Sequence, residues 1–362
     1  MSMDKTVAQK KLAACVFPLG GLLKCEVRSI ASSRGLQVAE KEESQDFVAG
    51  GMPWLLQGQG EPGPIIGEMC STGMTKSWEE ERSMAETLLE NKINRLHTVM
   101  SGKTSVLVAF SGGVDSTVVA KVAFEILGAR SAAATIDSPA LPRRELAIAQ
   151  RLAAEIGIRH FIIPAPDLDP ELVRNSCDRC YFCKQGDLAL LREAALRERY
   201  EIIAFGVTAS DHHEHRPGLR ALAEARAFLP LVEAGIVKSE MRAVAEQLAL
   251  SNSDLPSTTC LSSRIPYGQE ITPEKLARIE AAESFLYEQG FRQVRVRHDD
   301  GLARIEVSPA EIGQLLACRE QVSRQLKSLG FTYVTADLEG YRPGSMDEVL
   351  SRKRKREKGG ME

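Results

Sequence analysis

The sequence predicts an α/β protein with a doubly wound parallel sheet and a smaller C-terminal α+β domain. Between residues 78 and 265, short apolar runs alternate with helical patterns, as expected when helices cover both faces of a parallel sheet. After residue 266 the runs alternate apolar and polar residues, as in strands with one exposed face. We therefore expect a larger domain at 78–265 and a smaller one at 266–348.

The larger domain begins with apolar residues at helical spacing over 79–100. A continuous apolar run follows at 105–110 and predicts a strand buried on both faces. The remaining elements alternate in the same way, with helices predicted at 117–127, 143–156 and 179–200 and strands at 132–136, 160–163 and 202–205.

The smaller domain begins with a helix whose N-cap is Thr272 and whose first helical residue is Pro273. This helix is expected to run to about residue 289. The elements predicted after it are strands at 294–298 and 303–307, a helix at 309–329 and a strand at 332–336.

The two ends of the chain differ from the rest. Residues 1–77 show little periodicity and are rich in glycine and proline near their end, which predicts a disordered extension. Residues 349–362 contain a Lys/Arg run and are predicted to form a disordered basic tail. No apolar run approaches the ~20 residues that span a bilayer, and no secretory signal is recognisable. We expect a cytoplasmic protein with no membrane partner.

A glycine-rich loop joins the strand at 105–110 directly to the next helix, with the sequence Ser111-Gly112-Gly113-Val114-Asp115-Ser116. The glycines let the backbone approach an anion, and the N–H groups at the helix start can bind phosphate. Asp115 would be repelled by phosphate alone, so it suggests a bridging Mg²⁺ or a ribose contact. Gly206, directly after the strand at 202–205, is assigned to the same nucleotide site. An ordinary strand-to-helix turn is the alternative.

A Walker A loop at residues 101–104 is excluded. The position five residues before Gly102 holds His97 instead of glycine, and the Gly-Lys-Thr precedes the strand instead of following it.

Three of the eight cysteines fall within seven residues, at Cys177, Cys180 and Cys183. Cys180 and Cys183 lie one helical turn apart, and Cys260 from a distant loop can supply a third thiolate to a metal or an iron–sulfur cluster. A structural zinc site that includes Cys177, or redox thiols without a metal, are the alternatives.

The glycine-rich loop resembles the signature of the PP-loop ATP pyrophosphatases, which share the adenine nucleotide alpha hydrolase-like fold. From about residue 105 to 347 the chain is similar to a narrower family, the LarE-type sacrificial sulfur transferases. The segments that carry this similarity are 216–221, 262–268, 294–298 and 333–342, together with Asp211.

The resemblance implies an enzyme that uses ATP and Mg²⁺ to adenylate a carboxylate of pyridinium-3,5-biscarboxylic acid mononucleotide and then replaces its oxygen with sulfur. This reaction belongs to nickel-pincer cofactor synthesis. Asp115, Asp211 and Cys260 are the implied catalytic residues. One subgroup sacrifices the sulfur of a single cysteine, and another holds a 4Fe–4S cluster on three. Cys180, Cys183 and Cys260 resemble the second, and Cys177 is additional.

Four further residues are assigned to the substrate. Arg295 and Arg297 leave the same face of a strand and can grip a phosphate, although ordinary ion pairing is the alternative. Ser263 and Arg264 lie next to Cys260, where the guanidinium can neutralise a carboxylate or phosphate.

Two possible metal sites are not favoured by the sequence. Glu283 and Glu306 match two acidic residues of a divalent-metal site in the family, but Gln314 stands at the third position, which argues against a metal there. The histidines beside Asp211, at positions 212, 213 and 215, are expected to be solvated instead of metal-bound.

The expected partners are ATP, a small carboxylate mononucleotide and further copies of this chain. A tRNA thiolase with the same ATP and cluster chemistry is the leading alternative, although it would need a basic docking surface that the main domain lacks. A nonenzymatic ATP sensor and an amide-forming synthetase are two further alternatives. The net charge of −3 argues neither for nor against nucleic acid.

Overall fold

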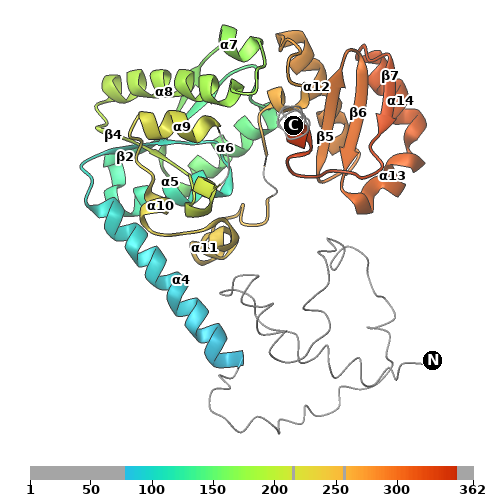
Figure 1. Cartoon of the computed structure of the whole chain (residues 1–362). Helices are drawn as coiled ribbons and strands as arrows, with labels where there is room; N and C mark the ends of the chain where they lie inside the picture. The colour runs from blue at the N-terminus through green and yellow to red at the C-terminus, as the bar shows by residue number, and fades with distance from the viewer. Residues whose placement is uncertain (1–77, 214–216, 256–257, 349–362) are drawn as a thin grey trace, which may run out of the picture. The chain divides into compact units, whose positions relative to one another are not determined.

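The computed structural model describes residues 78–213, 217–255 and 258–348, and these contain two β-sheets (Figure 1). The first has four strands in the order β3-β2-β1-β4, and all its neighbours are parallel. In chain order its part of the molecule consists of α4 (Trp78–Ser101), β1 (Val106–Ala109), α5 (Val114–Leu127), β2 (Ser131–Asp137), α6 (Arg143–Ile156), β3 (Arg159–Pro164), α7 (Pro170–Val173), α8 (Arg179–Glu198), β4 (Ile202–Phe205), α9 (Pro217–Glu224), α10 (Pro230–Glu233) and α11 (Met241–Gln247).

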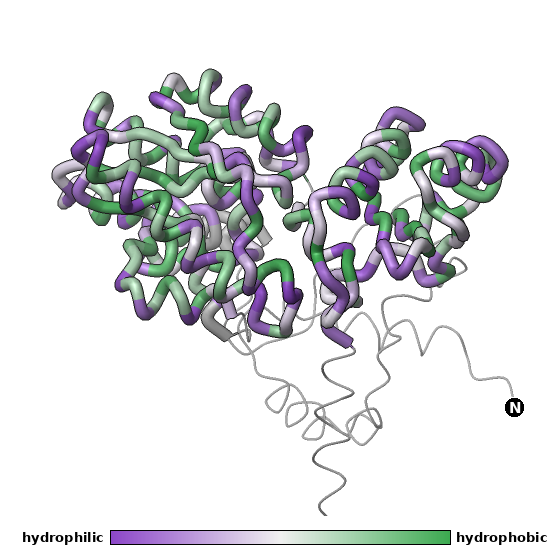
Figure 2. The backbone as a smooth tube through the Cα atoms, turned by 90° about the horizontal axis from the view of Figure 1, so that it is seen from above, coloured by the Kyte–Doolittle hydropathy of each residue, from purple (hydrophilic) through white to green (hydrophobic). Residues whose placement is uncertain are grey.

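Both faces of the first sheet are buried. Val106 and Val108 point into one apolar core, whereas Leu107 between them points into another. Helices α4, α5 and α6 contribute to the first core, and α8 and α9 to the second. Hydrophobic and hydrophilic stretches alternate along the helical turns of the backbone (Figure 2), as expected for helices with one buried face. The predicted doubly wound α/β architecture is therefore confirmed.

The second sheet has three strands in the order β5-β6-β7, with β5 and β6 antiparallel and β6 and β7 parallel. Its part of the molecule consists of α12 (Pro273–Glu288), β5 (Val294–Asp299), β6 (Leu302–Val307), α13 (Ile312–Ala317), α14 (Arg319–Ser328) and β7 (Tyr333–Ala336). Thr272 caps α12 as predicted, because its side chain accepts a hydrogen bond from the Lys275 backbone N–H.

Two details of the smaller α+β part were predicted wrongly. The helix expected over 309–329 is interrupted at Cys318, whose ψ of 15° leaves the helical range and separates α13 from α14. The strand β5 was expected to expose one face, but Val294 to His298 are all buried. Arginine side chains on this strand pair with carboxylates inside the protein, as described below, so the polar positions do not mark a solvent face.

The extension at 1–77, the tail at 349–362 and His215 lie outside the described residues. Among the described helices, none combines the length and hydrophobicity needed to cross a membrane.

Candidate active site

The loop between β1 and α5 has the construction of an anion-binding site. Gly112 adopts φ of 74°, a left-handed conformation that favours glycine. Gly113 is the N-cap of α5 and no side chain caps the helix, so the first backbone N–H groups lack a capping partner. The Ser116 hydroxyl donates to the Gly113 carbonyl at 3.0 Å and lies 3.1 Å from the Ser111 hydroxyl. Backbone N–H groups and two hydroxyls can therefore meet a phosphate here.

Gly206 closes this site from the neighbouring strand. The strand order reverses between β1 and β4, and in open α/β sheets ligands bind in the crevice outside the strand ends at such a point. A Cβ atom on Gly206 would lie 2.6 Å from the Ser116 backbone nitrogen and 2.8 Å from the Asp115 carbonyl carbon. Only glycine allows the chain after β4 to pack this closely against the loop.

Asp115 faces a lysine that the sequence analysis did not identify. The Asp115 carboxylate forms an ion pair with the Lys238 ammonium, and the other carboxylate oxygen is buried without a hydrogen-bond partner among the described residues. A carboxylate oxygen without a hydrogen-bond partner, beside a phosphate-binding loop, is the type of ligand that Mg²⁺ prefers. Asp115 and Lys238 are 123 residues apart, and no local pattern connects them.

Asp211 is linked to the Lys238 backbone by a series of hydrogen bonds. It is buried, and its carboxylate accepts hydrogen bonds from the Thr208 N–H at 2.9 Å and the Thr208 hydroxyl at 2.7 Å. The Thr208 hydroxyl contacts the Ser210 hydroxyl, and Ser210 accepts a hydrogen bond from the Lys238 N–H at 2.9 Å. Asp211 therefore stabilises the turn that positions Lys238.

The three predicted cluster ligands lie close enough for their charges to interact. Burial raises the pKa of Cys180, and the neighbouring Cys260 raises it further. Burial also raises the pKa of Cys183, with Asp187 and Cys260 adding to the effect. Three thiols from two segments are chemically suited to a soft metal or cluster. Within the described ranges, however, no three His, Cys, Asp or Glu side chains are arranged around a common ion position.

The turn before α8 is anchored by Asn175, which the sequence analysis also missed. Its buried amide donates hydrogen bonds to the carbonyls of Ile265, Pro266 and Gln269, and its oxygen accepts from Arg179 at 2.6 Å. Arg179 is next to Cys180 and stacks 4.2 Å from the Tyr267 ring centroid. This network attaches the start of α8 to the chain that follows Cys260.

Gly218, within a segment that supports the family resemblance, lies against Cys180. A Cβ atom on Gly218 would be 3.3 Å from the Cys180 carbonyl oxygen. The glycine therefore permits α9 to pack against the first turn of α8, which contains Cys180.

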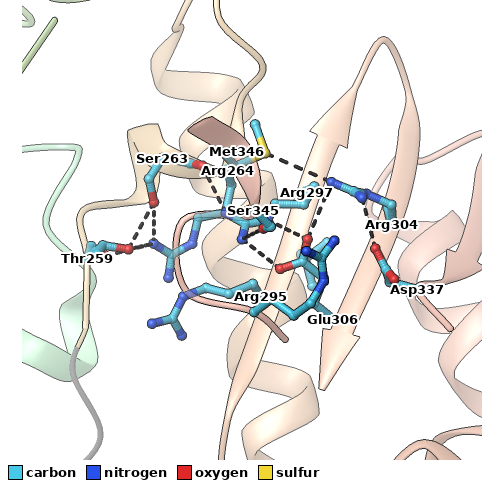
Figure 3. Close-up of polar contacts among 12 residues, drawn as sticks. Thr259, Ser263, Arg264, Arg295, Arg297, Arg304, Glu306, Asp337, Ser345 and Met346 are labelled. Atoms are coloured by element: carbon cyan, nitrogen blue, oxygen red, sulfur yellow. Dashed lines mark hydrogen bonds and ion pairs between the residues drawn. The ribbon is translucent and has the colours of Figure 1, made fainter. Parts of the chain in front are cut away.

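Arg264 holds the Cys260 loop in place. The residue is 1% exposed, and its guanidinium forms a bidentate ion pair with Glu283 of α12 at 2.9 and 3.0 Å. Its remaining amino group donates to the carbonyls of Thr259 and Cys260 at 2.7 and 2.9 Å and to the hydroxyls of Thr259 and Ser263 (Figure 3). The predicted substrate-binding guanidinium is thus bonded to the protein itself.

Arg297 supports the same loop from β5. It forms a bidentate ion pair with the buried Glu306 at 2.9 and 2.6 Å and donates to the Ser263 carbonyl at 3.0 Å (Figure 3). Arg295 is also buried, and its guanidinium lies 5.1 Å from the Tyr341 ring centroid. Glu283 and Glu306, considered for a divalent metal, are therefore each bonded to an arginine, while Gln314 donates to the Gln289 carbonyl.

Contacts of α8 also link its cysteines to the end of β4 and to the nucleotide loop. Lys184, next to Cys183, pairs with Asp187 at 2.8 Å, and its ammonium lies 5.9 Å from the centroid of the Phe205 ring. Phe205 ends β4 and directly precedes Gly206. A short series of contacts thus runs from the cysteines to the nucleotide loop.

Two family models match segments of the chain. A model described as asparagine synthase matches residues 89–175, which contain the loop. A model described as the tRNA methyl transferase HUP domain matches residues 4–49, within the segment predicted to be a disordered extension and outside the described residues.

Individual relatives cover more of the chain. An uncharacterized protein of Synechocystis is 41% identical over 268 residues, which are 73% of this chain and all of the relative. Pyridinium-3,5-bisthiocarboxylic acid mononucleotide synthase of Lactiplantibacillus plantarum is 38% identical over 249 residues, 68% of this chain and 90% of the relative. A tRNA-specific 2-thiouridylase of Frankia alni is 36% identical over only 127 residues, 33% of this chain and 35% of the relative.

The long match to the Lactiplantibacillus enzyme extends beyond the nucleotide loop, whereas the thiouridylase match covers a third of the chain. Together with the PP-loop fold, this similarity shows that the chain belongs to the LarE family of ATP-dependent sulfurtransferases.

Proposed function

We propose that this enzyme adenylates a carboxylate of pyridinium-3,5-biscarboxylic acid mononucleotide and converts it to a thiocarboxylate. The observation that carries the proposal is the presence in one protein of a phosphate-binding loop and of a hydrogen-bond network that joins the start of α8, with Cys180 and Cys183, to the chain after Cys260. The 38% identity to a synthase of the corresponding bisthiocarboxylic acid supports this choice of substrate.

In the first half-reaction, a substrate carboxylate oxygen attacks the α-phosphorus of ATP, and pyrophosphate leaves with the electrons of the broken P–O bond. The N–H groups at the start of α5 and the hydroxyls of Ser111 and Ser116 would hold the phosphates. The Lys238 ammonium would balance the charge that develops on the leaving pyrophosphate. Mg²⁺, when held by Asp115, would act as a Lewis acid on the phosphate oxygens.

In the second half-reaction, sulfur replaces AMP on the activated carbonyl carbon, and AMP leaves with the oxygen that it received from the substrate. Arg264 and Arg297 would keep the Cys260 backbone fixed while its side chain faces the reacting groups. A 4Fe–4S cluster, when bound by Cys180, Cys183 and Cys260, would supply an iron site for the incoming sulfur.

The test combines purified protein, ATP, Mg²⁺, sulfide and the pyridinium biscarboxylic acid mononucleotide under anaerobic conditions. We expect release of AMP and pyrophosphate, and a product in which one carboxylate oxygen is replaced by sulfur, measured by mass spectrometry. Cys260→Ser should keep pyrophosphate release but lose the sulfur-containing product. Cys318→Ser is the control, because Cys318 is not one of the three predicted cluster ligands, and it should keep both. Thiocarboxylate formation by Cys260→Ser would exclude the assigned role of Cys260.

Iron and sulfide content separate the two possible sulfur donors. If the three cysteines hold a cluster, anaerobically purified protein should contain iron and acid-labile sulfide, and Cys180→Ser should reduce both. Iron-free protein in which one cysteine becomes dehydroalanine during turnover, with loss of the mass of H2S, would instead support donation by a sacrificed cysteine.

A tRNA thiolase is the second candidate, because partial similarity to tRNA-specific 2-thiouridylases recurs among the relatives. Its ATP chemistry would be the same, but tRNA would stimulate AMP release and binding would weaken steeply with salt. AMP release that needs tRNA and ignores the mononucleotide would favour this candidate over the small-molecule reaction.

A further inference from the structure

Asn252 contacts the nucleotide loop from a distant segment. It lies in the chain after α11 and its side chain is completely buried. Its amide nitrogen donates to the Gly112 carbonyl at 3.1 Å and to the Thr117 hydroxyl at 3.0 Å. These contacts join residues 140 and 135 positions apart, so no local motif identifies them.

The chemistry of the two partners determines which end of the Asn252 amide faces them. The Gly112 carbonyl can only accept a hydrogen bond. The Thr117 hydroxyl donates its proton to the Gly113 carbonyl at 2.9 Å and therefore also accepts from Asn252. Turning the amide by half a rotation would place its oxygen against two acceptors, so the NH₂ group must face the loop.

The same contacts determine the direction of the loop backbone. With the Gly112 carbonyl bonded to Asn252, and the Gly113 carbonyl to the Ser116 and Thr117 hydroxyls, the groups left for a ligand are backbone N–H donors. A carbonyl facing the phosphates would repel them, whereas an N–H group attracts them. The other side of Gly112 is also constrained, because a Cβ atom there would lie 3.0 Å from Ala149.

We propose that Asn252 is a positioning residue that keeps the Gly112 carbonyl away from the nucleotide and so shapes the loop for the pyrophosphate part of ATP. This inference rests on the proposed function only in placing ATP phosphates at the Ser111–Ser116 loop. It does not depend on the identity of the carboxylate substrate or of the sulfur donor.

The experiment measures binding of inorganic pyrophosphate and of AMP, each with Mg²⁺, by calorimetry to the full chain and its variants. Asn252→Ala should weaken pyrophosphate binding at least ten-fold while changing AMP binding less than three-fold. Asn252→Asp keeps the shape but replaces the donor with an acceptor, so it should weaken pyrophosphate binding at least as much. Ser251→Ala is the matched control, because the Ser251 hydroxyl contacts Arg151 and Glu155 of α6 instead of the loop.

Three results would overturn the inference. One is wild-type pyrophosphate affinity in Asn252→Asp, which would show that the donor is not needed. Another is an equal loss of pyrophosphate and AMP binding in Asn252→Ala, which would indicate a general structural defect. The third is failure of the wild-type protein to bind pyrophosphate. This result would also contradict the proposed nucleotide site, and it differs from the first two because it occurs without any substitution.

Discussion

At Gly206 the absence of one carbon atom determines whether the nucleotide loop can form. We expect Gly206→Ala to reduce ATP-dependent AMP release roughly 100-fold, since displacement of a reacting group by about 1 Å has an effect of this size. The added methyl group would overlap the peptide that joins Asp115 to Ser116. Initial rates of AMP release measure the effect.

Gly186→Ala is the matched control for this substitution. Gly186 lies within α8, and a Cβ atom there would meet nothing within 4 Å. Alanine should therefore preserve activity and stabilise the helix by about 0.5–1 kcal/mol. Equal activity in the two variants would contradict the steric role of Gly206.

Single residues differ in how far the sequence predicts them. The loop at Ser111–Ser116 is recognisable because its residues are adjacent and its strand and helix follow directly. Lys238 and Asn252 are not, because they reach the loop across more than a hundred residues. The arginines are an intermediate case, since Arg264, Arg297 and the two glutamates could be named in advance, but not their pairing with each other inside the protein.

At the scale of elements, the ion pair between Arg264 and Glu283 attaches the Cys260 loop to α12. Both side chains are almost fully buried, at 2% and 5% exposure. We expect Glu283→Gln to lower the free energy of unfolding by about 3–5 kcal/mol, because removal of one partner leaves a buried guanidinium charge uncompensated. Urea unfolding measures the change.

The exposed pair Arg319–Glu320 provides the comparison, with side chains 69% and 80% exposed. Glu320→Gln should change the free energy of unfolding by no more than about 0.5 kcal/mol. If Glu283→Gln has an effect as small as this control, the buried pair does not hold the loop as argued.

Elements were predictable where the apolar pattern is long or continuous. The parallel strands were found because each contains a short, mostly apolar run between helices, and α6 and α8 because their apolar residues recur over several turns. Short helices such as α7 and α10, with four residues each, contain too little periodicity to be identified. The range of β5 was predicted correctly, but the burial of its polar side chains was not, because that burial depends on contacts with α12 and β6.

At the scale of the whole molecule, the half-buried His160 and the buried His298 are expected to make stability depend on pH. Burial lowers the pKa of His160 and of His298, whereas an unfolded chain has the ordinary value of about 6.5. Below that pH the unfolded state binds protons that the folded state does not. Stability is therefore complete above about pH 6.5 and decreases as the pH falls.

The midpoint of urea unfolding, measured between about pH 7.5 and 5.5, tests this expectation. The double variant His160→Gln, His298→Gln should show a flatter dependence than the wild-type protein. Superimposable profiles would mean that other groups control acid stability.

Asn175 illustrates how narrowly one position can be restricted. Its φ of 51° favours asparagine or glycine, its amide must donate to three carbonyls and its oxygen must accept from Arg179. Glycine has no amide side chain, aspartate has no donor, and glutamine is longer by one methylene. A library randomised at this codon and selected for folded protein should therefore return asparagine almost exclusively. Among distant sequences, its presence would be a sharper family marker than the glycine-rich loop, which many ATP-using enzymes share.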